Sequence, residues 1–439
     1  MIARLATGRR FPSTRVLGFV LSLVVVLALY LAGGWRPYVN VLPGFHYGIN
    51  SPFDAFNLLL PPGWWTLVQQ HLLMLRAAFA GFGICYYLTR HFSTDCRLFA
   101  PLSAGYAAAV YTGCIINLVW VDAALLLPFL LAAADHCLRS GNGKALTLLC
   151  FVCVLSNCYT AWPVCVFCFL YGIWQQLCLP GRLDLHRFRL SVAALVRAML
   201  PGVLLGVLPV LPVIVSQYQS DAFRFVPGTD NFGFAPMELA YCLFFGRYSS
   251  ACAAVGMPYL YIGSAALMLA LCYFLGTDST RAKFVSAALT AGVAASYLLD
   301  LPGISWQNGD DLAVFPFRYG FLLSAMLVIF AADTLVHQSP PVPALGAGLF
   351  LAAIYLLGYR GTVGSAARTW RLAAGTGLYL GGCVLVRLAG PARLAAPGGL
   401  AVVCSAAGRC GGQQLYLVVR RIFMAGSETG LTAAGGRGN

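Results

Sequence analysis

Long apolar stretches alternate with short polar segments along most of the chain. A helix needs about 20 mostly apolar residues to cross a bilayer, and each backbone amide in lipid needs a partner within the protein. The pattern therefore predicts a series of membrane-spanning helices. The predicted spans are Val16–Gly33, Trp65–Leu88, Leu98–Ile116, Val121–Leu138, Ala145–Cys158, Ala161–Leu177, Val192–Ser216, Tyr259–Leu275, Phe284–Leu299, Tyr319–Val336, Ala344–Leu357 and Leu372–Leu388, with a weaker one near Gly398–Ala407.

The composition agrees with this pattern. Hydrophobic residues make up 60% of the chain and charged residues 10%, and the mean hydropathy is +0.79. A soluble domain could not cover so much apolar surface with so few polar side chains. We expect an all-α, polytopic transmembrane helical bundle of about 12–13 spans over residues 1–388. Residues 389–439 are rich in Gly, Ala and Arg, and we expect a disordered or truncated tail there.

Basic residues are spread unevenly over the predicted loops. Lys and Arg concentrate in cytoplasmic loops, and a cytoplasmic N-terminus puts most of them on that side. The cytoplasmic set is Arg4, Arg9, Arg10, Arg15, Arg90, Arg97, Arg139, Lys144, Arg182, Arg187, Arg189, Arg281, Lys283, Arg387 and Arg393. The asymmetry predicts a cytoplasmic N-terminus and an uncleaved first span. It also accounts for the formal net charge of +14, so no nucleic-acid partner is expected.

The chain contains 16 cysteines, most of them inside predicted spans. The pairs Cys150/Cys153 and Cys165/Cys168 have CxxC spacing, which also occurs in metal sites. Cysteine packs in a span as a small apolar residue, and no histidine lies nearby in the sequence. We therefore expect packing rather than metal binding. No cofactor is expected, although a divalent metal stays an open alternative.

Two polar stretches at predicted outer loops contain carboxylates. Asp54 lies in the loop before the second span and is a candidate base or metal ligand, or else a solvated or capping side chain. Asn117, Trp120 and Asp122 lie where the third span ends and the fourth begins. Asp122 could face a substrate, or it could stabilise the start of its helix.

Further polar residues lie near the same predicted membrane surface. Asn157 and Tyr159 mark a hairpin between two spans, and Arg318 enters a span just after two carboxylates. Arg76 lies inside the second span, where an arginine should face a polar cavity or a partner rather than lipid. Together these positions suit a lipid-linked substrate whose polar head lies at the outer face and whose tail lies in the bilayer.

Four of these stretches resemble motifs of the bacterial YfhO family. They read SPFDAFNLLLP, NLVWVDAALLLPF, SNCYTAWPV and FPFRYGFLLSA, and they occur in the family's order over most of Gly44–Val336. YfhO proteins resemble the GT-C class of integral-membrane glycosyltransferases. The resemblance implies a GT-C-like bundle in the bacterial cytoplasmic membrane. It also implies sugar transfer from an undecaprenyl-phosphate-linked sugar to an extracytoplasmic cell-envelope polymer such as teichoic acid.

The chain departs from the family pattern in its first outer loop. The acidic motif expected there is missing, Asp54 stands where the family usually has another residue, and the chain is shorter than usual for the family. Whether the chain is an active enzyme is therefore left open. A transporter or flippase for lipid-linked substrates, and a catalytically inactive fragment, are the alternatives.

Glycosyl transfer at the outer face would give each candidate site residue a role, although the resemblance does not transfer the catalytic role to Asp54. A carboxylate, Asp54 or Asp122, would act as the catalytic base. The remaining candidates would bind the substrate, and the arginines would stabilise the departing lipid phosphate. The substrate-binding candidates are Asn117, Trp120, Asn157, Tyr159, Arg318 and Arg76.

Overall fold

The structure is a computed structural model. It describes residues 13–32, 61, 64–114, 121–181, 184–219, 239–240, 242–243, 258–276, 279–297 and 319–337. All regular secondary structure in these ranges is α-helical, which confirms the expected all-α class. The helices are α1 (Thr14–Ala32), α2 (Trp65–His91), α3 (Phe99–Cys114), α4 (Val121–Ser140), α5 (Lys144–Ser156), α6 (Cys158–Cys178), α7 (Leu185–Gln219), α10 (Ser264–Leu275), α11 (Thr280–Ala295) and α13 (Gly320–His337).

Each predicted span from Val16–Gly33 to Tyr319–Val336 overlaps one of these helices, although α10 begins at Ser264, five residues after the predicted start at Tyr259. Within the described residues, six helices are long and apolar enough to cross a membrane. The three later predicted stretches, Ala344–Leu357, Leu372–Leu388 and Gly398–Ala407, lie outside the described residues. The tail from residue 389 onward also lies outside them.

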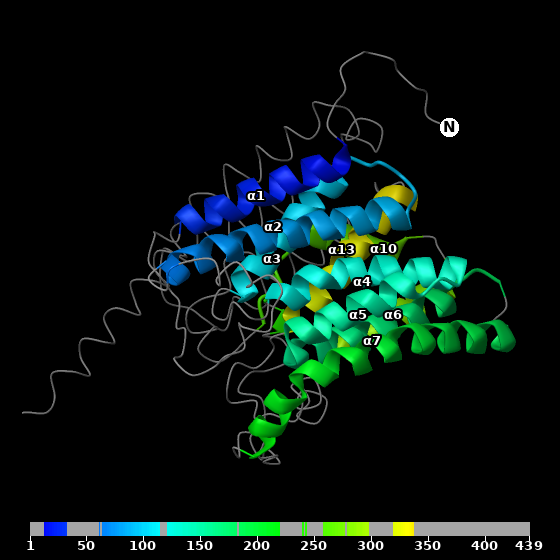
Figure 1. The fold of residues 1–439 in the computed structure, drawn as a ribbon. Coiled ribbons are helices and arrows are strands. Elements are labelled where there is room, and N and C mark those ends of the chain that lie inside the picture. The colour runs from blue at the N-terminus through cyan, green and yellow to red at the C-terminus, as the bar shows by residue number, and fades with distance from the viewer. Residues whose placement is uncertain are drawn as a thin grey trace, which may run out of the picture.

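Helix α7 is much longer than its predicted span of Val192–Ser216. It has 35 residues, about 52 Å at the usual helical rise. The Asp184 side chain accepts hydrogen bonds from the backbone N–H groups of His186 and Arg187 at 2.9 and 3.2 Å. These bonds begin the helix before its apolar part. Three prolines lie inside α7, and its C-terminal part bends away from the bundle (Figure 1), as internal prolines commonly cause.

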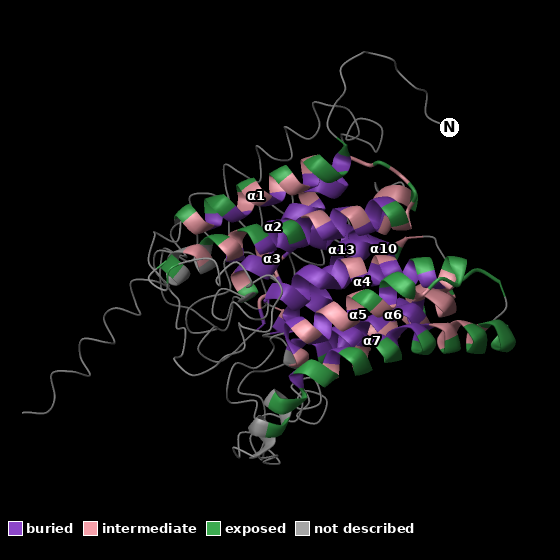
Figure 2. Ribbon diagram, viewed as in Figure 1, coloured by how far each residue is buried: buried purple, intermediate pink, exposed green. Residues whose placement is uncertain are grey.

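The helices form layers around a buried centre. Most residues of α4 and α13 are buried, whereas α1 and α7 expose many large apolar side chains. Figure 2 shows this as a purple centre flanked by helices with green outer faces. Exposed Val24 of α1 and Leu208 of α7 are examples, at 55% and 63% exposure. Side chains of this kind suit contact with lipid rather than water.

Helices α5 and α7 approach closely through small residues. Gly202 and Gly206 of α7 are spaced as a GxxxG motif, which allows backbones to meet in membranes. A Cβ at Gly202 would lie 2.1 Å from the carbonyl oxygen of Thr147, and a Cβ at Gly206 would lie 2.7 Å from the Cβ of Val154. The Thr147 hydroxyl donates to the Ala198 carbonyl at 2.6 Å. This helix pair therefore has no room for larger side chains.

We predict that Gly202→Ala lowers stability by about 1–3 kcal/mol, the usual cost of overpacking. The new methyl group would meet backbone of α5, which cannot rotate away. Unfolding of the purified protein in detergent, followed by circular dichroism, measures the change. Gly292→Ala in α11 is the matched control, because a Cβ there meets nothing within 4 Å. Equal stabilities of the two variants would contradict the close α5–α7 contact.

The expected topology can be tested at the two ends of the bundle. Asn142 lies in the α4–α5 turn and Gly113 near the end of α3, and both are exposed. In a background without the native cysteines, Asn142→Cys should be protected from an impermeant thiol reagent in whole cells. Gly113→Cys should be labelled, because the positive-inside pattern places its end outside. The reverse labelling would invert the orientation of the chain.

Candidate functional site

Two of the candidate residues meet inside the bundle. Nη1 of Arg76 lies 3.2 Å from Oδ1 of Asp122, and the two side chains are 6% and 1% exposed. Charged groups are rarely buried without a counter-charge, because their removal from water costs several kcal/mol each. In a membrane helix such a pair is a candidate for function. It is the central feature of the site.

The fold brings this pair together because α2 and α4 run parallel. Since α3 returns the chain across the bundle, both helices begin at the same end. At their other ends His91 of α2 meets Asp135 of α4, with Nδ1 and Oδ2 2.5 Å apart. In α2, Arg76 and His91 are fifteen positions apart, which is about 22 Å along the helix axis. In α4, Asp122 and Asp135 are thirteen positions apart, which is about 20 Å. The two contacts therefore keep the helices in one register.

The pair lies near the N-terminal end of α4. Asp122 is in the first turn of α4, about 12 Å along the helix from its midpoint at Leu130. The hydrocarbon core extends about 15 Å to either side of its centre. If α4 spans this core, the pair lies close to the level at which lipid headgroups begin. Asp122 also carries its negative charge in the first turn of the helix, which the helix dipole favours.

Asn157 forms the turn between α5 and α6. Its backbone is extended and its N–H donates to the Cys153 carbonyl, while its Oδ1 accepts the backbone N–H of Thr160 at 3.2 Å. Asn157 thus ends one helix and caps the next. The structure gives this residue a structural role, and the predicted substrate contact stays a prediction.

Thr160 is a further polar residue at this level, and sequence reasoning did not select it. Helices α4 and α6 run parallel, because the Cys168 thiol donates to the Leu130 carbonyl at 3.7 Å and the Tyr171 hydroxyl to Asp135 at 2.7 Å. Counting eight residues back from Cys168 and Leu130 places Thr160 level with Asp122. The Thr160 hydroxyl is buried and has no hydrogen-bond partner in the structure. Such a buried hydroxyl calls for a ligand or water.

The structure does not place the remaining candidate residues in this site, because they lie outside the part of the chain that it describes. Asp54, Asn117, Trp120 and Arg318 lie outside that part, as does the side chain of Tyr159. Their predicted roles stay predictions. The motif SNCYTAWPV contains Thr160, but a threonine in an apolar helix has no local signal that separates it from a packing residue. Only the register of α4 and α6 reveals its position.

The described residues contain no group of three or more His, Cys, Asp or Glu side chains arranged to hold a metal ion. The cysteines whose side chains the structure describes are free thiols. A metal would therefore need ligands from elsewhere in the chain or from a substrate. The chemistry that the described site offers is that of a carboxylate, a guanidinium and a hydroxyl.

The fold and the site define a polytopic helical membrane protein with an ion pair held inside its bundle. The family model described as bacterial membrane protein YfhO matches residues 39–390. The chain belongs to this family, which confirms the resemblance seen in its four motifs. A search of curated proteins and a search of solved structures found no match.

A double-mutant cycle tests whether Arg76 and Asp122 depend on each other. Asp122→Asn leaves the Arg76 guanidinium without this counter-charge, and we expect a loss of about 3–5 kcal/mol in stability. Arg76→Gln should cost a similar amount, and the double variant should cost clearly less than the sum of the two. Unfolding in detergent gives all four stabilities. Additive effects would show that the two charges do not interact.

Proposed function

We propose that this protein transfers a sugar from an undecaprenyl-phosphate-linked donor to a cell-envelope polymer such as teichoic acid. The transfer takes place at the outer face of the bacterial cytoplasmic membrane, and the N-terminus lies in the cytoplasm. The observation that carries the proposal is the buried Arg76–Asp122 pair in a protein of the YfhO family. The Thr160 hydroxyl, at the level of Asp122 along the bundle, adds a buried polar group there.

The position of the pair suits a lipid-linked donor. The polyprenyl tail of such a donor stays in the hydrocarbon, so its phosphate lies at the boundary of the apolar layer. A guanidinium binds phosphate oxygens with two parallel hydrogen bonds. Arg76 could therefore exchange the Asp122 carboxylate for the donor phosphate and still have an anionic partner.

The released carboxylate then has a chemical role. Asp122 would take the proton from the acceptor hydroxyl, whose oxygen attacks the anomeric carbon of the sugar. A new bond forms between this carbon and the acceptor oxygen as the bond to the phosphate oxygen breaks. The leaving lipid phosphate takes the electron pair, and Arg76 stabilises its negative charge. Displacement from the opposite face inverts the anomeric configuration.

The other predicted residues have supporting roles in this proposal. Asp54 is the second candidate base, and Arg318 the second candidate for the phosphate. Asn117, Trp120, Asn157 and Tyr159 would contact the sugar from the turns around the pair. The Thr160 hydroxyl adds a donor and an acceptor at the level of Asp122.

Transport of a lipid-linked substrate is the second candidate function, and the pairing itself supports it. Arg76 is already charged and shielded from lipid by Asp122, as a phosphate-binding site in a transporter would be. A transporter would use the cation to hold the phosphate and would need no base. Replacing only the base should therefore separate the two functions.

We predict that a folded Asp122→Asn variant loses sugar transfer but keeps or strengthens donor binding, because the phosphate no longer competes with Asp122 for Arg76. Asparagine keeps the size of the side chain but cannot accept the proton from the acceptor. Transfer of radiolabelled sugar from a defined polyprenyl-phosphate donor, in proteoliposomes with an added polymer acceptor, measures the activity. Donor binding is measured on the same samples.

Asp95→Asn is the matched control, because Asp95 is an exposed carboxylate in the α2–α3 loop at the other end of the bundle. Full sugar transfer in a folded Asp122→Asn variant would exclude Asp122 as the base. Donor movement across the bilayer without sugar transfer in the wild type would favour the transporter.

A further inference from the structure

The other end of the α2–α4 pair contains a pocket that the proposed function does not use. Its cavity volume is about 330 Å³, within the usual range of about 300–1,000 Å³ for ligand pockets. Four basic side chains and three hydroxyl side chains line it together with a single carboxylate. The lining residues are Tyr87, Thr89, Arg90, His91, Ser93, Ala132, Asp135, His136 and Arg139.

Contacts within the protein already occupy the carboxylate of this pocket. Oδ1 of Asp135 accepts the Tyr171 hydroxyl at 2.7 Å, and its Oδ2 lies 2.5 Å from Nδ1 of His91. The Tyr171 hydroxyl in turn lies 2.6 Å from that of Tyr87. Asp135 is therefore held by groups of α2 and α6. Its charge is balanced locally, so it does not make the pocket a cation site.

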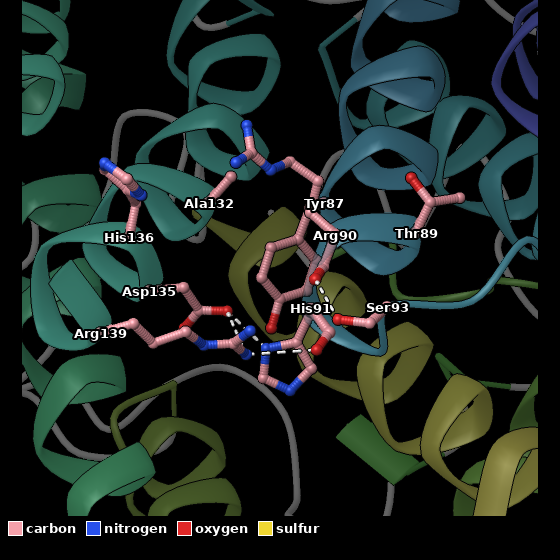
Figure 3. Close-up of a pocket in the computed structure, with 9 residues that line it drawn as sticks. All are labelled: Tyr87, Thr89, Arg90, His91, Ser93, Ala132, Asp135, His136 and Arg139. Carbon is pink, nitrogen blue, oxygen red and sulfur yellow. Dashed lines mark hydrogen bonds and ion pairs between the residues drawn. The ribbon is translucent and has the colours of Figure 1, made fainter.

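The two arginines retain donors for a ligand. Arg139 Nη2 donates to the His91 carbonyl at 3.2 Å and lies 3.8 Å from Asp135, yet the side chain is 56% exposed. Arg90 Nη1 donates to the Tyr86 hydroxyl at 2.7 Å. In Figure 3, Asp135, Arg139 and His91 meet low in the view, whereas Arg90 and His136 extend on the opposite side. An anion bound between these two groups of side chains could contact Arg139 on one side and Arg90 on the other.

A third arginine lies beside the pocket. Arg15 Nε of α1 donates to the hydroxyl of Thr89 at 3.0 Å, and its guanidinium lies 5.1 Å from the centre of the Tyr86 ring. The Arg90 guanidinium lies 5.6 Å from the same ring. Three helices thus bring guanidinium groups to one place, which suits a phosphate with several oxygens.

An aromatic stripe leads from this cluster toward the middle of the apolar layer. It consists of Phe79, Phe82 and Tyr86 of α2 with Phe129 of α4. The ring centres of Phe82 and Tyr86 are 6.5 Å apart, and those of Tyr86 and Phe129 are 5.9 Å apart. Phe79 is 42% exposed. Arg90 follows Phe79, Phe82 and Tyr86 on the same helical face, since these positions recur every three to four residues.

We propose that this pocket binds the phosphate of an anionic membrane phospholipid, whose acyl chain lies along the aromatic stripe. Arg139 lies about 14 Å along α4 from its midpoint at Leu130, near the level of lipid phosphates in a bilayer. Basic pockets between membrane helices bind acidic headgroups in this way. The stripe distinguishes a lipid from a free phosphate, which would leave it uncovered. The site is independent of the proposed function, because it lies at the opposite ends of α2 and α4.

Lipid binding to the delipidated full-length chain in detergent tests the proposal. Native mass spectrometry measures the affinity for short-chain phosphatidylglycerol and phosphatidylcholine. We expect phosphatidylglycerol to bind more tightly, and Arg90→Gln with Arg139→Gln to weaken it about tenfold. Arg187→Gln with Arg189→Gln is the matched control, because it removes two charges from exposed sites at the start of α7. The control should bind like the wild type.

Two further variants keep the test decisive. If the double variant fails to fold, Arg90→Gln alone removes a guanidinium that hydrogen-bonds the Tyr86 hydroxyl and lies over its ring. Phe79→Ala should weaken phosphatidylglycerol binding by severalfold without changing the effect of inorganic phosphate. Equal binding of the two lipids, or equal effects of the pocket and control variants, would overturn the proposal. Displacement of the lipid by inorganic phosphate, with Phe79→Ala without effect, would assign the pocket to free phosphate instead.

Discussion

A charged contact at each end of the parallel α2–α4 pair is the interaction on which the rest of the bundle depends. Arg76 meets Asp122 at one end, and His91 meets Asp135 at the other. Each group is largely removed from water, so separating either pair would leave a charge with little solvation. Apolar attraction is non-directional, whereas each of these contacts needs one particular partner, so both are satisfied in a single register of α2 and α4. The neighbouring helices pack against a helix pair whose alignment is already set.

This constraint explains why both sites lie where they do. A buried guanidinium needs an anion, and Asp122 supplies one at the start of α4, where the helix dipole also favours a carboxylate. At the other end, the last turns of α2 and α4 carry basic residues, which the helix C-terminus favours. Arg139 bridges the two helices by donating to a terminal carbonyl of α2. The charges that align the helices are thus also the groups that a ligand could use.

The helices could be predicted from the sequence almost completely, because a span is a local property of about 20 residues. Each predicted span within the described residues overlaps a helix, and the clearest differences in length are α10, which is shorter than predicted, and α7, which is longer. Its first turns carry exposed charged residues, so hydropathy did not include them, although Asp184 signals the start. The site could be predicted only in part. Arg76 and Asp122 were both selected as charges near apolar spans, but nothing local shows that residues 46 apart pair.

Other site residues depend on tertiary register and were therefore missed. In the sequence, Thr160 cannot be told apart from any other threonine in a helix. Only the alignment of α6 with α4 shows that it lies level with Asp122. Asp135 lies inside a predicted span and could have been selected as an intramembrane carboxylate. Its partners, Tyr171 and His91, come from two other helices and have no sequence signal. Asn157 is the opposite case, because it was predicted to bind substrate and the structure shows its side chain capping α6.

Helix α4 carries both charged contacts, and Pro128 lies between them and is buried. A proline inside a helix removes one backbone hydrogen bond. Exchange of Asp122 for a donor phosphate on Arg76 would change the contact at one end of α4 alone. The Tyr171 and His91 contacts of Asp135 lie at the other end and take no part in that exchange, so two ligands could occupy the α2–α4 pair at the same time.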